Sequence, residues 1–261
     1  MSKNSLILFY LFFIIQGCSL VNLQLSASRK IPPEKIVLDT NVELSSCGTI
    51  NSNGVDFLPS AFKLIANGMV IYIDPIVITD TLKADYIFLT HAHLDHFSIK
   101  DIQKISKAET IIICPRSVSK KMSKNTYTIK EVVPGDFLDF DNFSCQAVPA
   151  YNQQSVLLGL KAHPKSKQNV GYLLTLNNDL RIYHAGDTDY IPELNQLRKI
   201  KLAMIPIGGD KLCMNAEKAA ELINKIKPEI VVPMHYETEN KEDLVTFKKL
   251  LKTGIQVMFL E

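Results

Sequence analysis

The chain has 261 residues, of which 46% are hydrophobic, so it is long enough for one large domain or two small ones with a substantial core. Its 29 Lys and Arg residues and 27 Asp and Glu residues leave a formal net charge of only +2, which gives no reason to expect a nucleic-acid partner. The composition is otherwise that of an ordinary globular protein, so function has to be sought in local patterns.

The N-terminus carries the pattern of an export signal. Lys3 supplies a positive charge, and an unbroken apolar run covers residues 6–15. That run is too short for a membrane-spanning helix, which needs about 20 residues, and we predict a signal peptide over residues 1–17. The sequence IQGC at residues 15–18 resembles the bacterial lipobox, which implies cleavage before Cys18 and lipid on its thiol. A simple signal peptide or a short anchor is the alternative.

Lipid on Cys18 would anchor the protein to a bacterial membrane outside the cytoplasm, in the periplasm or at the cell surface. The remaining thiols are an even number, which permits disulfides in an exported protein: Cys47, Cys114, Cys145 and Cys213. Cys114 and Cys145 lie in apolar segments and are equally consistent with buried free thiols. Residues 18–35 are polar-leaning and contain Pro32-Pro33, so we predict a tether or N-terminal arm there and a folded domain over residues 36–261.

The first part of this domain is predicted to consist of short strands joined by tight turns. Runs rich in β-branched and aromatic residues lie at 55–58, 69–74 and 86–91. Asn67-Gly68, between the first two of these runs, predicts a hairpin turn. Ser98 is expected to begin a helix, with Asp101 as its partner in a capping box, and residues 110–114 follow as a buried strand.

The rest of the chain alternates strands with helices. Further strands are predicted at 137–140, 143–148, 170–176, 181–184, 202–207 and 230–235. Asn215 is expected to cap a helix that ends before Pro228, and an amphipathic helix is expected over residues 241–252. The pattern predicts an α/β fold of two mixed sheets packed together with helices outside, a four-layer αββα sandwich.

Three of the six histidines, His91, His93 and His96, fall within six residues, with Asp95 among them, directly after an apolar strand. Residues two apart in an extended stretch point to the same side, so His91 and His93 can hold one ion together. Asp95 and His96 follow after the chain bends and can face a second position. Imidazole and carboxylate groups are ligands for zinc and similar divalent ions, so the cluster predicts a metal site.

The HAHLDH motif at residues 91–96 resembles the signature of the metallo-β-lactamase superfamily. Three more motifs resemble those of the superfamily and occur in the order found there. Asp74-Pro75 precedes HAHLDH, and HAGDT at 184–188 and PMHY at 233–236 come after it, so the resemblance covers about residues 55–240. Together with PIGG between the last two motifs, they make the chain most similar to the branch that includes ascorbate-6-phosphate lactonase and the N-acyl-phosphatidylethanolamine phospholipase D type.

The resemblance implies two divalent metal ions, zinc or alternatively manganese, with a hydroxide between them as the nucleophile. The implied ligands are shared between the two ions: His91 and His93 for the first, Asp95, His96 and His235 for the second, and Asp187 for both. The resemblance also implies that Asp74 orients a ligand histidine and that Asp95 assists proton transfer to the leaving group.

The chain departs from the family pattern at a further histidine of the first ion, where Asn152 stands. A carboxamide oxygen is a weaker zinc ligand than imidazole, so either this ion is held more loosely or another residue substitutes. His163 is the candidate, and a solvated loop histidine is the alternative interpretation of it. A second departure is Pro59-Ser60-Ala61, which replaces the Gly-His-Ala of many relatives, so the lactonase substrate does not carry over.

We therefore predict a metal-dependent hydrolase that cleaves an ester, lactone or phosphodiester in a small-molecule or lipid-like substrate. The fold alone does not choose among these bonds. One alternative is a non-catalytic surface lipoprotein that binds metal or ligand through a degenerate first site. Another is redox chemistry, because some members of the superfamily hold iron.

Overall fold

The structure is a computed structural model of the chain, and it describes residues 25–27, 35–52, 54–122, 127–176, 178–209, 211–239 and 241–260. The predicted signal peptide, Cys18 and most of the predicted tether lie outside the described residues. In the described part, no helix is both long and apolar enough to cross a membrane. The four described cysteines, Cys47, Cys114, Cys145 and Cys213, are free thiols, so the disulfides that their number permitted do not form.

The first of two seven-stranded sheets has the order β10-β9-β8-β7-β6-β3-β2. Its strands are β2 (Lys35–Asp39), β3 (Val42–Ser46), β6 (Phe62–Ala66), β7 (Met69–Ile73), β8 (Tyr86–Phe88), β9 (Ile111–Pro115) and β10 (Thr128–Val132). Strands β7 to β10 run parallel, and β2, β3, β6 and β7 pair antiparallel. Asn67 and Gly68 join β6 to β7 with φ angles of 51° and 85°, which confirms the predicted turn, but the strand that enters it is β6 and not the predicted run at 55–58.

The second sheet has the order β11-β12-β13-β14-β15-β16-β18. Its strands are β11 (Phe137–Phe140), β12 (Phe143–Pro149), β13 (Val170–Leu176), β14 (Arg181–His184), β15 (Leu202–Pro206), β16 (Ile230–Met234) and β18 (Gln256–Val257). Strands β14, β15, β16 and β18 are parallel to one another. Short 3-10 turns, η1 (Lys165–Lys167) and η2 (Pro192–Gln196), lie in the connections on either side of β13 and β14.

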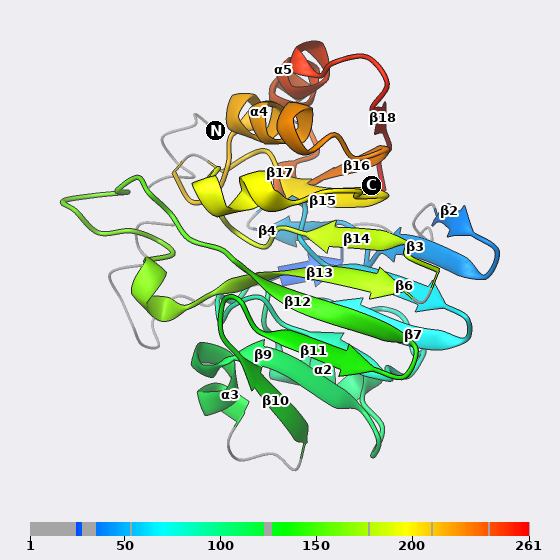
Figure 1. The fold of residues 1–261 in the computed structure, drawn as a ribbon. Helices are drawn as coiled ribbons and strands as arrows, with labels where there is room; N and C mark the ends of the chain where they lie inside the picture. The colour runs from blue at the N-terminus through cyan, green and yellow to red at the C-terminus, as the bar shows by residue number, and fades with distance from the viewer. Residues whose placement is uncertain are drawn as a thin grey trace.

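Helices cover the outer face of each sheet, which confirms the predicted four-layer sandwich (Figure 1). Helices α2 (Ile99–Ile105) and α3 (Arg116–Met122) pack on the first sheet, and α4 (Ala216–Ile226) and α5 (Lys241–Leu250) pack on the second. The main hydrophobic core lies between the sheets, where Phe88 and Phe143 face each other from opposite layers. Ser98 caps α2 as predicted, but Asp101 accepts the backbone N–H groups of Val77 and Ile78 instead of completing a capping box.

A small four-stranded sheet connects the two halves of the sandwich. It has the order β1-β4-β5-β17, with β1 (Leu25–Ala27), β4 (Ile50–Ser52), β5 (Val55–Leu58) and β17 (Tyr236–Glu237). Strand β1 lies within the predicted tether and pairs antiparallel with β4. Strand β17 directly follows His235 and pairs with β5, so the C-terminal half is tied to the first half beside that histidine.

The parallel strands of both sheets end at one edge of the sandwich. Asp74 follows β7, the 91–96 loop follows β8, Asp187 follows β14 and His235 follows β16. In open α/β sheets, ligands bind outside the carboxyl ends of parallel strands, because side chains from several strands converge there. The topology therefore brings the predicted metal-binding residues to one place.

Candidate metal centre

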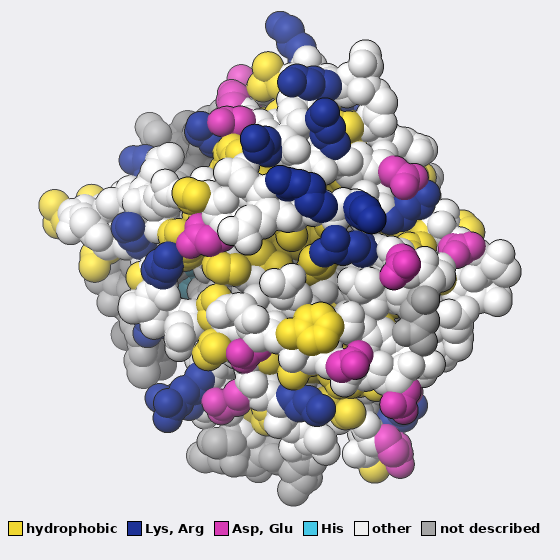
Figure 2. Space-filling model, viewed as in Figure 1, with side chains coloured by type: hydrophobic (Ala, Val, Ile, Leu, Met, Phe, Trp, Pro, Cys, Tyr) yellow, Lys and Arg dark blue, Asp and Glu magenta, His cyan; other side chains and the backbone are white. Residues whose placement is uncertain are grey.

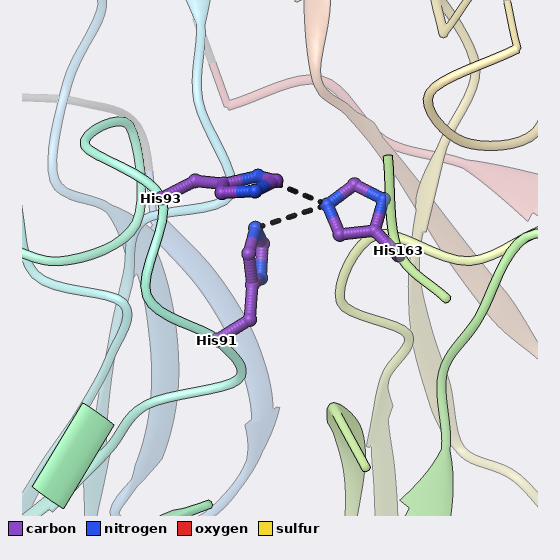
Figure 3. A group of neighbouring side chains, drawn as sticks. All are labelled: His91, His93 and His163. Atoms are coloured by element: carbon purple, nitrogen blue, oxygen red, sulfur yellow. Dashed lines mark hydrogen bonds between the residues drawn. The ribbon is translucent and has the colours of Figure 1, made fainter. Parts of the chain in front are cut away.

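Three imidazoles meet at the first half of the centre, and one of them comes from a distant loop (Figure 3). Nε2 of His163 lies 3.3 Å from Nε2 of His91 and 3.1 Å from Nδ1 of His93. One nitrogen from each ring therefore points to a common position, and all three lie within 4.8 Å of one another. His91 and His163 are buried, whereas His93 is exposed and forms the solvent side of this group.

His163 is held in this orientation with the help of Asn152, the residue that stands where the family has a further histidine. The side-chain oxygen of Asn152 accepts the backbone N–H of His163 at 2.8 Å, and the carbonyl of Leu212 accepts from its ring Nδ1 at 2.9 Å. Asn152 in turn donates to the same Leu212 carbonyl at 2.8 Å and to Asp189 at 3.1 Å. With a proton on Nδ1, Nε2 of His163 keeps its lone pair toward His91 and His93.

The second half of the centre gathers two histidines and two carboxylates, namely Asp95, His96, Asp187 and His235, whose ligand atoms also lie within 4.8 Å of one another. Nε2 of His235 lies 3.4 Å from Oδ2 of Asp95, and Nε2 of His96 lies 3.7 Å from the same oxygen. Asp95 is partly accessible, whereas the other three side chains are buried.

One carboxylate oxygen of Asp187 lies between the two halves. Its Oδ2 is 3.3 Å from Nε2 of both His96 and His235, and 3.9 Å and 3.8 Å from Nε2 of His91 and His163. A buried anionic oxygen surrounded by four imidazole nitrogens is positioned to contact groups in either half.

The outward-facing ring nitrogens of His91 and His96 are fixed by one buried aspartate. Asp74 accepts hydrogen bonds from the ring Nδ1 of His96 at 2.7 Å, from the hydroxyl of Thr90 at 2.6 Å and from the backbone N–H of Thr90 at 2.8 Å. The Thr90 oxygen lies 2.9 Å from Nδ1 of His91. These contacts place the protons on Nδ1 and leave both Nε2 atoms facing inward, as outer partners do for metal-binding histidines.

The two halves differ in protonation. Burial lowers the pKa of His91 well below its usual value and lowers the pKa of His163 to about 3, so these rings are neutral. In the other half, burial opposes protonation, yet Asp187 raises the pKa of His96 and His235 well above the usual value. Although burial acts against it, His96 and His235 also lower the pKa of Asp95 to about 2.

Several polar atoms at the centre lack a hydrogen-bond partner within the described residues. They are Nε2 of His96, Nε2 of His235 and Oδ1 of Asp187, and all three are buried. Unsatisfied buried polar groups are costly and call for an explanation. Nitrogen and carboxylate donors in two convergent groups fit the requirements of divalent metal ions, and the outer nitrogens of four of the histidines already have partners: His91, His96, His163 and His235.

Two further residues lie beside the centre, Cys213 and His184 of the HAGDT motif. The Sγ of Cys213 is 3.6 Å from the outer Nδ1 of His235, and burial raises the pKa of this thiol to about 11. His184 is a satisfied buried residue, because its Nε2 donates to the Ser60 carbonyl at 2.9 Å and its Nδ1 accepts the Gly186 N–H at 3.1 Å. It therefore holds the turn before Asp187 and does not point into the centre.

The sequence did not reveal three groups that organise the centre. Thr90 bridges Asp74 and His91, Asp189 receives the Asn152 amide, and the Leu212 carbonyl orients His163. Thr90 and Asp189 adjoin motif residues, which is the only signal that the sequence gives for them. The Leu212 contact is a backbone interaction across 49 positions and leaves no sequence signal.

Comparison with known proteins places the chain in a family. Residues 57–235 match the model of the β-lactamase superfamily domain. A UPF0173 protein of Pyrococcus furiosus is 33% identical over 199 residues, which cover 74% of this chain and 87% of the relative. A UPF0173 metal-dependent hydrolase of Nanoarchaeum equitans is 32% identical over 205 residues, covering 72% and 87%.

A solved structure agrees with this placement. The crystal structure of a Parabacteroides distasonis protein described as a metal-dependent hydrolase has a TM-score of 0.69 and 28% sequence identity, and the match covers 88% of this chain and 98% of that one. The chain belongs to the β-lactamase superfamily, and its relatives include UPF0173 proteins named as metal-dependent hydrolases.

Proposed function

We propose that this protein is a metal-dependent hydrolase with a centre for two divalent ions. One ion would be held by His91, His93 and His163, and the other by Asp95, His96 and His235. The observation that carries the proposal is the position of Asp187 Oδ2, within 3.9 Å of imidazole nitrogens from both groups. The orphaned inward atoms of the second group support it further.

Bound divalent ions would make water nucleophilic near neutral pH and would polarise the carbonyl or phosphoryl oxygen under attack. The chain's own groups supply orientation and proton transfer. Asp74 and Thr90 bind the outward Nδ1 atoms of His96 and His91, so that the Nε2 atoms of both rings face inward. Asp95 is partly accessible at the edge of the second group, so it is placed to relay a proton between water and a leaving group.

The bonds that we propose for cleavage are an ester, a lactone or a phosphodiester. The HAGDT and PMHY motifs are similar to those of the ascorbate-6-phosphate lactonase and N-acyl-phosphatidylethanolamine phospholipase D branch, which favours a phosphate-bearing or lipid-like substrate. The non-catalytic alternative depended on a missing first-ion ligand. The inward Nε2 of His163 supports the enzyme instead, because this histidine completes a three-nitrogen group.

The test is hydrolysis by chain that has been stripped with a chelator and reloaded with zinc or manganese. Bis-p-nitrophenyl phosphate, p-nitrophenyl acetate and a γ-lactone would each be assayed, beside an Asp95→Asn variant. Activity that disappears with the metal, returns with it and falls at least 100-fold in the variant would support the proposal. A reloaded chain without activity on any of these bonds would contradict it.

We also propose that a lipid on Cys18 anchors the protein to a bacterial membrane outside the cytoplasm. The lipobox-like IQGC after the apolar run supports this. Mass spectrometry of the protein from membranes should find an N-terminal Cys18 carrying diacylglycerol. A mature chain that begins elsewhere, or one whose Cys18 carries no lipid, would contradict the anchor.

A further inference from the structure

A narrow arm that projects from the body of the domain carries an apolar tip. We define the arm as residues 153–162, and Figure 1 shows this segment extending from the left side of the molecule. The backbone N–H of Val156 donates to the Leu160 carbonyl, and that of Leu160 donates to the Leu157 carbonyl, both at 2.8 Å. Leu158 and Gly159 have φ angles of 48° and 83°, so they form a tight hairpin turn.

Leucine is an unfavourable residue for the tip of such a turn. Left-handed backbone favours Gly or Asn, yet Leu158 occupies it and its side chain is 92% exposed. Leu160 is 50% exposed and Leu157 is 39% exposed on the same turn. Single exposed leucines need no explanation, but three on one projecting tip form a contiguous apolar surface, which marks an interaction site.

The surroundings of the tip are basic. Residues 152–168, which include the arm, contain three lysines and no Asp or Glu, and all three lysines are exposed: Lys161, Lys165 and Lys167. Glu193, from outside this segment, pairs with Lys165 at 3.0 Å. Figure 2 shows hydrophobic side chains at the tip of the projection and Lys or Arg side chains nearer its base.

An anionic bilayer matches this arrangement. Apolar side chains enter the boundary of the acyl chains, while lysines around them remain at the lipid phosphates. A second copy of the chain fits less well, because a symmetric contact through the tips would bring like-charged lysines together. We propose that the arm inserts its leucine tip into an anionic lipid surface.

The arm is tied firmly to the metal centre at its base. Asp189 accepts the backbone N–H groups of Gln153 at 2.7 Å and Gln154 at 3.2 Å, and the returning side leads directly into His163. Insertion of the tip would therefore set the His163 side of the centre against the lipid headgroups. Docking itself rests on the arm alone, whereas its consequence, hydrolysis of a membrane-presented substrate, rests on the proposed function.

The chain has no Trp, so a single introduced Trp reports on its own surroundings even if another part of the protein also binds lipid. The test compares full-length Leu158→Trp with Val245→Trp, because Val245 is 62% exposed on α5, away from the arm. Vesicles of phosphatidylglycerol and phosphatidylcholine, with and without acyl-chain bromination, would be added. We expect a shift of emission to shorter wavelength and at least twofold quenching by brominated lipid for Leu158→Trp, and neither effect for Val245→Trp.

Unchanged Leu158→Trp emission on protein that sediments with the vesicles would overturn the proposal, as would absence of binding or equal quenching in both variants. Lys161→Gln with Lys167→Gln should reduce the preference for anionic over neutral vesicles at least fivefold, and an unchanged preference would contradict the role of charge. Failure of the hydrolase proposal would appear separately, as an absence of metal-dependent cleavage of soluble esters and phosphodiesters by unmodified protein that still quenches normally at the tip.

Discussion

The side-chain oxygen of Asn152 accepts a hydrogen bond from the backbone N–H of His163 at 2.8 Å and lies 3.0 Å from Nδ1 of the same ring. The residue that replaces the expected histidine thus supports a histidine that arrives 11 positions later. In this chain the position at which the family has a histidine is occupied by Asn152, while the imidazole itself comes from His163. The hydrogen bond between the two residues links these positions.

Replacing Asn152 with Ala should lower the affinity for the first ion, although all three of its predicted ligands remain. The variant leaves the His163 N–H without its partner, so the protein should lose about 1–3 kcal/mol of unfolding free energy. Loss of an outer partner typically reduces metal affinity about 10–100-fold. Competition with a chromophoric chelator measures this affinity. Asn224→Ala, on the far side of α4, is the matched control, and equal affinities in the two variants would show that Asn152 does not support the ion.

Replacing Asp74 with Asn should move the ring proton of His96 from Nδ1 to Nε2. The carboxamide presents an N–H where the carboxylate oxygen accepts from His96 Nδ1 and the Thr90 hydroxyl. The ring would then carry its proton on Nε2, the atom that faces Asp187, and affinity for the second ion should fall about 10–100-fold. The chemical shifts of ¹⁵N-labelled histidine report the tautomer directly. An Nδ1-protonated His96 in the variant would contradict this account of Asp74.

Metal binding should release protons mainly from the second group. His96 and His235 have raised pKa values and bind protons near pH 7 in the metal-free chain, whereas His91 and His163 have lowered pKa values and do not. Ligand nitrogens must be deprotonated, so filling both sites at pH 7 should release about two protons, and affinity for the second ion should rise with pH. Calorimetry in buffers of different ionisation enthalpy counts these protons, and a value near zero would refute the assignment.

The same shifts predict how the metal-free protein responds to pH. The raised pKa values of His96 and His235 contribute stability that is complete below pH 6.5 and is lost as pH rises through their folded values. The lowered pKa of Asp95 contributes stability above about pH 4 that is lost as pH falls toward about 2. His91 and His163 have lowered pKa values and oppose this trend below pH 6.5, but at pH 7.5 their rings are neutral in both the folded and the unfolded chain. Thermal unfolding without metal should therefore give a lower midpoint at pH 9 than at pH 7.5, whereas a higher midpoint at pH 9 would contradict the predicted charges.

Much of the fold could be predicted from local sequence. Asn67-Gly68, Ser98 and Asn215 begin or join elements where they were expected to, because turns and helix caps depend on the chemistry of single residues. Strand β1 was not predicted, since Leu25–Ala27 gains its partner from β4, more than twenty positions away. Asp101 took long-range backbone partners for the same reason, and spacing within a helix carries no information about them.

The residues of the metal centre likewise fall into those that the sequence revealed and those that only the fold brings together. His91, His93, Asp95 and His96 were recognisable because they are close in sequence, and Asp187 and His235 because each belongs to a motif at a strand end. His163 stayed ambiguous, since its position depends on the arm returning toward Asn152 and on the Leu212 carbonyl. Thr90 and Asp189 looked unremarkable in sequence, because their roles consist of hydrogen bonds that only the folded loops create.

The most direct test of the central claim is metal content per chain by elemental mass spectrometry, on unmodified protein and on His163→Ala. Because His163 supplies one of three nitrogens to the first group, we predict two ions in the unmodified chain and one in the variant. Asn224→Ala is the control, since this side chain bonds to the Leu250 carbonyl and the Lys252 N–H at the end of α5, and it should retain two ions. Two ions in both the unmodified protein and His163→Ala would remove His163 from the ligand set. One ion or none in the unmodified protein, with no refilling on dialysis against zinc or manganese, would contradict the two-ion centre.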